Sequence, residues 1–150
     1  MQKATIEEKE IMRIKAIRAM NYAFSVNSEH NIGACLITKN GNFYEGCNVE
    51  NSISGLGSCA ERNAVNNAVA HGEYFFKSIL VIHDGKEPIY PCGMCLQYLL
   101  EFSQISKDDI EIIMCNLEGR ENKSSLRKLL PNGYYADEKR HNLAKFRDME

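Results

Sequence analysis

The chain has 150 residues, a formal net charge of −2 at pH 7 and a hydrophobic fraction of 44%. This length suits one domain over 1–150, and the balance of apolar and charged residues is that of a folded globular protein rather than a disordered one. No apolar run approaches the roughly 20 residues of a membrane span, and the first ten residues lack the apolar core of a secretory signal. A net charge of −2 gives no sign of the excess of basic residues with which proteins usually bind long nucleic acid. We therefore expect a cytoplasmic protein without membrane or long nucleic-acid partners.

Hydrophobic periodicity and turn residues predict nine elements in the order α-β-β-α-β-α-β-α-α. In chain order they are a helix over 5–22, strands over 31–38 and 43–49, a helix over 59–71, a strand over 78–83, a helix that follows Pro91 and runs to 102, a strand over 110–115, and helices over 124–130 and 137–146. The apolar stripe of the first helix is expected to combine Ile6, Ile11, Ile14 and Ile17 with Met12, Ala16 and Met20.

Local signals support several of these boundaries. Thr5 with Glu8 forms a capping box for the first helix. Asn40-Gly41 is typical of a hairpin turn between the first two strands. Gly72 ends the second helix.

This order predicts an α/β fold with three α/β/α layers. An antiparallel hairpin is followed by β-α-β units, whose right-handed crossovers place helices on the sheet. We expect a mixed sheet in which the N-terminal hairpin precedes parallel strands. The core of the domain spans about 5–134, and 135–150 form a helical tail.

The six cysteines divide into two groups. Cys92 and Cys95 form a C-x-x-C pair, and Cys59 is a candidate third member. Disulfides are rare in a reducing compartment, so another role is needed. The remaining three lie inside apolar runs and are predicted to be small buried hydrophobes: Cys35, Cys47 and Cys115.

Cys59 and the C-x-x-C pair both fall where a loop enters a predicted helix, and helix N-termini favour thiolates. Three thiolates supply three of the four ligands of tetrahedral zinc, and an open fourth position is the mark of a catalytic site. Glu61 follows Cys59 by two residues, where a carboxylate can take a proton from water and pass it to a substrate. The alternatives are a structural zinc site completed by His71 or His83, and a redox dithiol.

The C-x-E and P-C-x-x-C pair resembles the zinc-dependent cytidine deaminases, and the surrounding motifs resemble their small homotetrameric class. The resemblance covers about 32–134 and includes I-G-A-C-L-I-T (32–38), G-C-N-V-E-N (46–51), S-C-A-E-R (58–62), P-C-G-M-C-L-Q (91–97), E-F (101–102) and L-L-P (129–131). It implies Zn²⁺ as cofactor, a homotetramer with shared active sites, and a nucleoside substrate.

The resemblance also assigns roles residue by residue. Asn48 and Glu50 are expected to bind the ribose, and Glu61 with the backbone of Ala60 to face the cytosine ring. Arg62 is expected to donate to a zinc-bound thiolate and withdraw part of its charge.

Four positions depart from the family pattern. His30 stands where the family has an aromatic residue that stacks on the base, and Tyr134 where it has a Phe that reaches a neighbouring subunit's site. Ser54 replaces a Tyr, and Leu96 replaces an Arg. These changes leave the zinc chemistry untouched and bear on the choice of base.

The implied activity is hydrolytic deamination of cytidine and deoxycytidine to uridine and deoxyuridine, with release of ammonia, in pyrimidine salvage. The first alternative is a deaminase of a cytosine nucleoside analogue such as blasticidin S, whose enzymes share the zinc motif and an L-L-P-x-G-Y ending; retained Asn48 and Glu50 argue against it. A deaminase of bases in RNA or DNA would need a basic channel. A zinc-stabilised module without activity would not need Glu61.

Overall fold

The computed structural model describes residues 1–149 and contains one five-stranded sheet with the strand order β2-β1-β3-β4-β5. The strands are β1 (Ile32–Thr38), β2 (Phe43–Cys47), β3 (Phe76–His83), β4 (Glu111–Asn116) and β5 (Glu121–Ser125). The helices are α1 (Ile6–Met20), α2 (Ala60–Ala70), α3 (Gly93–Ser106), α4 (Leu126–Leu129), α5 (Glu138–His141) and α6 (Ala144–Arg147).

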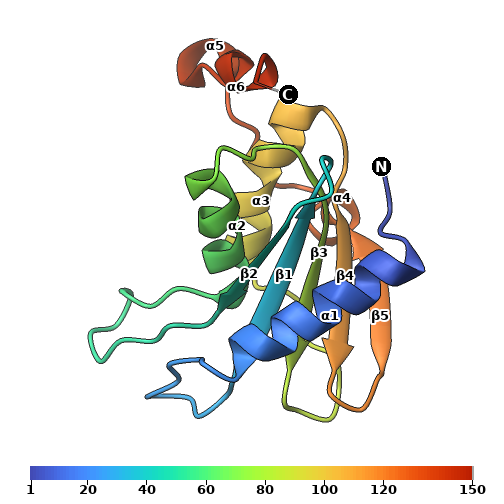
Figure 1. Ribbon diagram of the computed structural model, residues 1–150. Coiled ribbons are helices and arrows are strands. Elements are labelled where there is room, and N and C mark those ends of the chain that lie inside the picture. Colours follow the sequence, from blue (N-terminus) through green and yellow to red (C-terminus); the bar gives the residue numbers. More distant parts are fainter. Residues whose placement is uncertain (150) are drawn as a thin grey trace.

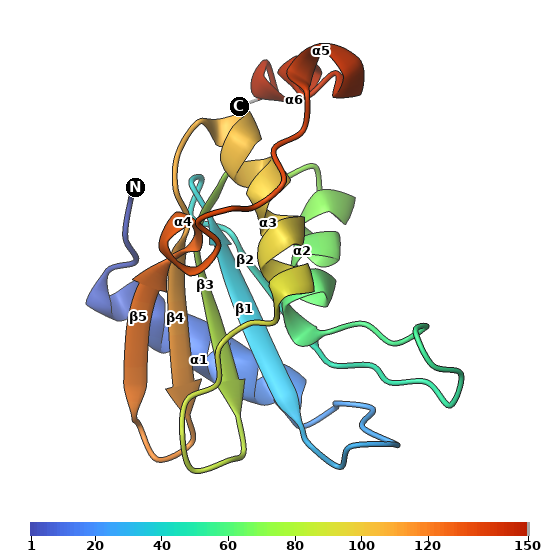
Figure 2. The same ribbon diagram turned by 180° about the vertical axis from the view of Figure 1, so that it is seen from behind.

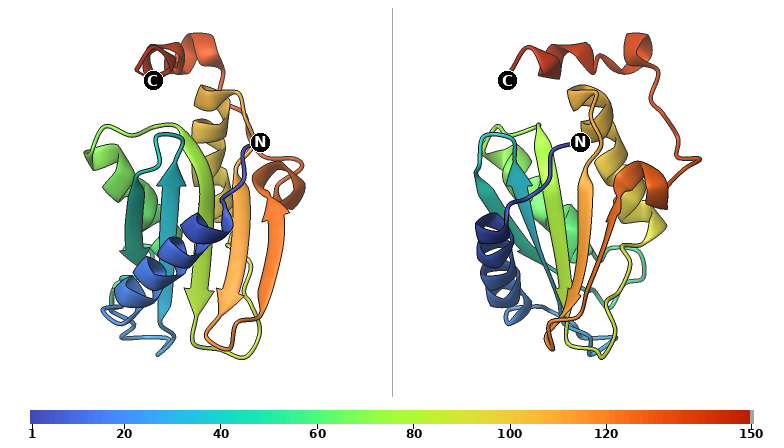
Figure 3. Two further views of the ribbon diagram at one scale, coloured as in Figure 1. Left: turned by 45° about the vertical axis from the view of Figure 1, so that its right-hand side comes forward. Right: turned by 90° about the vertical axis from the view of Figure 1, so that its right-hand side faces the viewer.

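Helices cover both faces of the sheet. Helix α1 lies across one face, and α2 and α3 lie on the other (Figure 1), as the reverse view confirms (Figure 2). An edge-on view separates the three layers (Figure 3). The predicted three-layer α/β fold is therefore confirmed.

Alternation along the strands produces one apolar core on each face. In β1, Ala34 and Leu36 belong to the core under α2 and α3, whereas Cys35 and Ile37 belong to the core under α1. Successive strand side chains point to opposite faces, so a strand buried on both sides reads as a continuous apolar run. This pattern accounts for the uninterrupted hydrophobicity of β1, β3 and β4.

Strand pairing differs in part from the sequence prediction. Among the described strands, β3 and β4 form the parallel pair, whereas β1 pairs antiparallel with both β2 and β3. Strand β5 pairs antiparallel with β4 and was not predicted. Its sequence, Glu-Asn-Lys-Ser-Ser, lacks apolar alternation because it is a polar edge strand, and polar edges discourage pairing with other chains. The predicted helix over 124–130 shrinks accordingly to α4.

The buried face of α1 also differs from the predicted stripe. Met12, Ala16 and Met20 are buried as expected, but Ile6 is 80% exposed, and Ile11 and Ile14 are exposed as well. A Cβ atom at position 33 of β1 would collide with the backbone carbonyl of Ala16, so the helix crosses the sheet directly over a glycine. This close crossing selects the face with the small residue, so Ile6, Ile11 and Ile14 remain exposed, whereas Ile17 packs partly buried against the core.

The C-terminal segment forms two short helices instead of the single helix predicted over 137–146. They are separated at Asn142, whose φ of 52° is left-handed. Gln97 donates to the carbonyl of Tyr134 and accepts from its N–H, both at 2.8 Å. Gln104 makes the same pair of bonds with Ala136, at 3.1 and 2.9 Å. The tail is thus attached along α3 and ends beyond it (Figure 1).

The capping box of α1 is confirmed: the Thr5 hydroxyl accepts from the N–H of Glu8, and the Glu8 carboxylate accepts from the N–H of Thr5. Within residues 1–149, no helix is long and apolar enough to cross a membrane.

Candidate active site

Two helix N-termini meet at one end of the sheet and bring the three motif cysteines together. Cys59 is the N-cap of α2 and Cys92 is the N-cap of α3. Both helices start at the end of the sheet where β3 finishes (Figure 2). A Cβ at position 46 of β2 would lie 2.6 Å from the carbonyl oxygen of Ala60, so this glycine lets α2 begin directly against the sheet.

The three thiol groups form a compact donor set. The Sγ atoms of Cys59, Cys92 and Cys95 all lie within 4.8 Å of one another, and those of Cys92 and Cys95 are 3.4 Å apart. Sulfur ligands at about 2.3 Å from tetrahedral zinc lie about 3.8 Å apart, so this spacing suits a zinc ion bound by three thiolates. Among the His, Cys, Asp and Glu side chains of the described residues, Cys59, Cys92 and Cys95 form the group of three whose ligand atoms lie close enough together to hold a metal ion.

The electrostatics of the cluster favour a thiolate at Cys59. Its pKa falls to about 5, first because Cys95 donates a hydrogen bond to its sulfur and also because Arg62 and Cys92 stabilise the anion. The same hydrogen bond raises the pKa of Cys95, as does its burial. Thiols must lose their protons when they bind a metal ion. Because Cys59 is already a thiolate, fewer protons have to leave when a cation binds to this site.

Arg62 lies against the cysteine cluster from the first turn of α2. Its guanidinium donates to the carbonyl oxygen of Gly57 at 3.4 Å and is held beside Cys59, which raises the pKa of the arginine. Its Nε atom is buried and has no hydrogen-bond partner among the described residues. A buried N–H group without a hydrogen-bond acceptor destabilises the folded state. The electron-rich sulfur atoms beside Arg62 are acceptors to which this N–H group can donate.

Glu61 is a nearly buried carboxyl group beside the cysteines. It is 5% exposed, and burial raises its pKa, with a further contribution from the negative charge of Cys59. It lines a cleft of about 330 Å³ together with Cys59 and Cys92. The cleft therefore joins a metal-binding cluster to a buried carboxyl group whose pKa is raised.

The two predicted sugar-binding residues also line this cleft. Asn48 is nearly buried, and its amide oxygen accepts from the N–H of Ile32 at 2.8 Å while its amide nitrogen donates to the carbonyl of His30 at 2.9 Å. Glu50 accepts from the N–H of Asn27 at 2.7 Å and from the N–H and hydroxyl of Ser28. Both side chains are therefore held by the segment that leads into β1, and Asn48 also by the first residue of β1.

The structure places the other predicted site residues less directly. His30 is exposed and does not line the cleft. Ala60 is buried in the first turn of α2 between two cleft residues. Tyr134 is 68% exposed and lines a separate groove along α3 with Met94 and Tyr98. Neither His30 nor Tyr134 faces the cleft of its own chain.

Sequence reasoning missed other residues of the cleft. Ile89 and Tyr90 form part of its wall, and Ser28 and Ile32 form another part. Ile89 and Tyr90 directly precede the Pro-Cys motif, and this adjacency was a signal for their location. Ser28 gave no comparable signal, because its contact with Glu50 spans 22 residues.

Comparison with known proteins agrees with this geometry. Residues 6–108 match the family described as the cytidine and deoxycytidylate deaminase zinc-binding region. The chain belongs to the cytidine deaminase family. Cys59, Cys92 and Cys95 accordingly form the zinc site of a zinc-dependent hydrolase.

Individual members of the cytidine deaminase family align over most of the chain. Cytidine deaminase from Sporosarcina psychrophila is 36% identical over 117 residues, which cover 78% of this chain and 84% of that protein. The enzyme from Halalkalibacterium halodurans is 32% identical over 131 residues, 87% of this chain and 97% of that one. The crystal structure of cytidine deaminase from Burkholderia pseudomallei superimposes with a TM-score of 0.77 at 35% identity, covering 83% and 98% of the two chains. Blasticidin-S deaminase from Bacillus cereus is 24% identical over 116 residues, 72% and 79% of the two chains.

Proposed function

We propose that this chain hydrolyses cytidine and deoxycytidine to uridine and deoxyuridine and releases ammonia. The observation that carries the proposal is the placement of Glu61 in one cleft with Cys59 and Cys92. A structural zinc site would need a fourth protein ligand, and neither His71 nor His83 belongs to the cysteine cluster. Three protein ligands would leave the fourth position of a tetrahedral zinc ion free for water, and the carboxyl group of Glu61 lies in the same cleft. Both features favour a catalytic site over a structural one.

Bound zinc supplies Lewis-acid activation of water at neutral pH. Glu61 takes the proton that the attacking water loses and delivers it to N3 of the cytosine ring. As the water oxygen bonds to C4, a hydroxyl group forms there; Glu61 takes the remaining proton of that hydroxyl and delivers it to the amino group, so that the C4=O bond forms as the C4–N bond breaks and ammonia leaves. Because Glu61 is buried, its carboxyl group is poorly solvated in the charged form, and this suits a group that must both accept and release a proton.

Asn48 and Glu50 provide a polar wall for the sugar. An amide offers both a donor and an acceptor, and a carboxylate offers acceptors only, so together they suit a substrate hydroxyl group. A site that pairs with a hydroxyl discriminates strongly against an analogue that lacks it, by up to about 10⁴-fold. We therefore expect free cytosine to be a poor substrate.

A substrate panel tests this proposal. Ammonia release is measured with cytidine, deoxycytidine, cytosine, blasticidin S and a single-stranded oligonucleotide. Turnover of the two nucleosides well above cytosine supports the assignment. Equal turnover of cytosine and cytidine, with Glu50→Ala affecting both alike, would reduce Asn48 and Glu50 to a strand-end turn.

The second candidate is deamination of blasticidin S. The similarity to the Bacillus cereus enzyme and the shared Leu-Leu-Pro-x-Gly-Tyr segment ending at Tyr134 favour it. Its distinguishing result in the same panel is ammonia release from blasticidin S at a kcat/KM above that for cytidine.

We further propose a homotetramer in which Tyr134 reaches the site of a neighbouring copy. Its exposed ring, carried on a segment that Gln97 holds by two backbone hydrogen bonds, supports this role. We place the enzyme in the cytoplasm, in pyrimidine salvage. The absence of disulfides among the six cysteines is in keeping with a reducing compartment, where zinc-binding thiols persist.

A further inference from the structure

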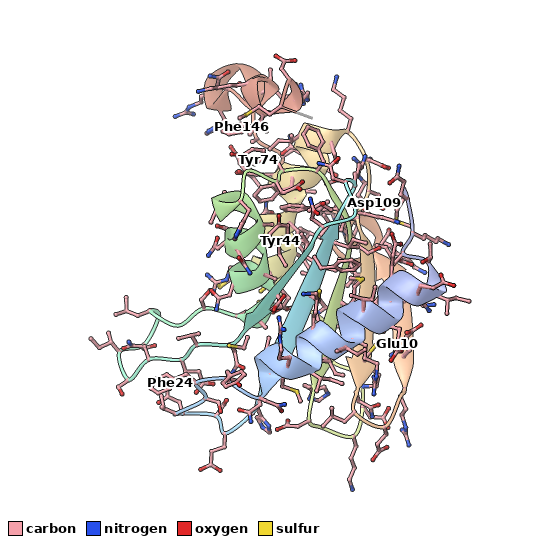
Figure 4. All side chains as sticks on the ribbon, in the orientation of Figure 1. Glu10, Phe24, Tyr44, Tyr74, Asp109 and Phe146 are labelled. Atoms are coloured by element: carbon pink, nitrogen blue, oxygen red, sulfur yellow. The ribbon has the colours of Figure 1, made fainter. Side chains whose placement is uncertain are left out.

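The segment between α1 and β1 is joined to the sugar wall of the cleft by backbone pairing. The N–H of Phe24 donates to the carbonyl of Asn48 at 3.0 Å, and the N–H of Glu50 donates to the carbonyl of Phe24 at 2.7 Å. Figure 4 shows Phe24 on this segment, close to the strand that leads into Asn48. The pairing brings Asn27 and Ser28 of the following residues against the side chain of Glu50.

Most of the accepting capacity of Glu50 is used within the protein. Its Oε2 atom accepts from the N–H groups of Asn27 and Ser28, at 2.7 and 3.1 Å. Its Oε1 atom accepts from the hydroxyl of Ser28. Two carboxylate oxygens have about four lone-pair positions, so one position remains, on Oε1.

Ser28 is the side chain that determines where this remaining position lies. Its hydroxyl hydrogen is donated to Glu50, and its oxygen accepts from the N–H of His30 at 3.2 Å. Both Ser28 and Glu50 line the cleft. The two backbone N–H groups hold one oxygen of the carboxylate, and the hydroxyl holds the other, so the carboxylate plane cannot rotate.

We propose that Ser28 is a positioning residue for sugar recognition, which holds Glu50 in one orientation and leaves it a single acceptor position for a substrate hydroxyl. This inference rests on the proposed function, because it requires Glu50 to bind the sugar. Three donors on the carboxylate also lower the pKa of Glu50, so it stays an anionic acceptor. Loss of the Ser28 hydroxyl leaves the Oε1 atom of Glu50 free to move. We expect this to weaken binding of the nucleoside and to leave proton transfer at the cytosine ring unaffected.

Steady-state kinetics of the zinc-loaded enzyme with cytidine test the inference. Ser28→Ala is expected to raise KM about tenfold with kcat changed less than twofold, because the interaction with the sugar is made in the ground state as well as in the transition state. Ser28→Thr retains the hydroxyl and is expected to restore KM. The matched control is Ser25→Ala, which removes a hydroxyl from the same segment that bonds Asn31 instead of Glu50, and its KM should stay within twofold of the parent.

A double-mutant cycle distinguishes positioning from loop stability. If Ser28 acts through Glu50, Ser28→Ala adds nothing to the KM of Glu50→Ala. An additive rise, or a rise equal to that of Ser25→Ala, overturns the inference while leaving the sugar role of Glu50 intact. If Glu50→Ala itself leaves the KM for cytidine unchanged, the proposed sugar role fails and this inference fails with it.

Discussion

Cys59 and Glu61 differ in role because of their positions relative to one helix end. Cys59 is the N-cap, with extended backbone, and its side chain makes no capping hydrogen bond. Its sulfur therefore stays available to a metal. Glu61 lies in the first helical turn, in the positive field of the helix N-terminus, yet it is nearly buried. One residue of spacing thus separates a metal ligand from the proposed proton carrier.

Glu61→Gln is expected to keep the zinc and lose most of the turnover. The amide matches the shape of the carboxyl group but cannot take up a proton, and removal of a general acid/base costs about 10²–10⁴-fold. Cytidine turnover and zinc content per chain should be measured on the same preparation. Near-normal turnover in Glu61→Gln would assign the proton transfer to another group.

Zinc content should depend on the cluster cysteines and not on the others. Cys92→Ser is expected to bind less than one zinc per chain after dialysis against a chelator, because an alcohol is a far weaker ligand than a thiolate. The matched control is Cys47→Ala, at the half-buried end of β2 and outside the cluster, which should retain the metal. Equal zinc content in both variants would contradict the assigned ligand set.

At the scale of elements, one side chain both caps α1 and joins it to the sheet. The Glu8 carboxylate accepts from the N–H of Thr5 and also pairs with Lys77 of β3, with Nζ–O distances of 2.8 and 2.6 Å. Burial alone would raise the pKa of Glu8, but the bonds from Lys77 and Thr5 outweigh it, and the pKa is lowered. The start of α1 is therefore anchored by a charged group.

Glu8→Ala is expected to reduce the free energy of unfolding by about 1–2 kcal/mol at pH 7, from a lost cap and a partly exposed ion pair. A lowered pKa in the folded state means that this stabilisation is present above the unfolded pKa and is lost as the pH falls through the folded one. Urea unfolding of parent and variant should therefore converge below the ordinary glutamate value of 4.5. Glu10→Ala, an exposed change on the same helix (Figure 4), is the control and should stay within about 0.5 kcal/mol at every pH.

The elements that could be predicted from sequence are those with local signals. The capping box, the Asn40-Gly41 turn and the apolar strands β1, β3 and β4 depend on neighbouring residues. Strand β5 and the division of the tail at Asn142 depend on distant pairing and on one left-handed residue, and neither leaves a periodic pattern.

The site divides in the same way. The cysteine cluster and Glu61 could be predicted because each motif is contiguous and starts a helix. The contacts of Ser28 with Glu50 could not, because they need the segment before β1 to pair with residues after β2. The exposed isoleucines of α1 have the same origin, since the buried face was decided by a glycine in the strand beneath it.

At the scale of the whole molecule, the proposed assembly makes the active site depend on two copies of the chain. Tyr134 and Glu61 lie on different surfaces of one chain, in a groove along α3 and in the cleft. If Tyr134 of one chain completes the active site of a neighbouring chain, a tetramer can be assembled from two variants, one defective at Glu61 and the other at Tyr134. Some active sites of that mixed tetramer then contain both an intact Glu61 and an intact Tyr134.

Glu61→Gln and Tyr134→Ala are therefore expected to complement each other. Each variant alone should turn over cytidine poorly, whereas co-expressed chains should recover a measurable fraction of the parent activity. Sedimentation should show a tetramer in every sample. A monomer that is fully active at nanomolar concentration, or mixed tetramers without recovery, would contradict the shared site.

The glycines at positions 33 and 46 restrict how this sequence can diverge. At both positions the backbone of a helix occupies the volume that any Cβ would need, so even alanine requires α1 or α2 to move away from the sheet. Gly41 and Gly119 differ, because open space surrounds them and only their left-handed backbone favours glycine. Among descendants of this chain, glycine at 33 and 46 would persist through any change of substrate, because it preserves the distance between layers, whereas asparagine could replace the turn glycines without loss of the fold.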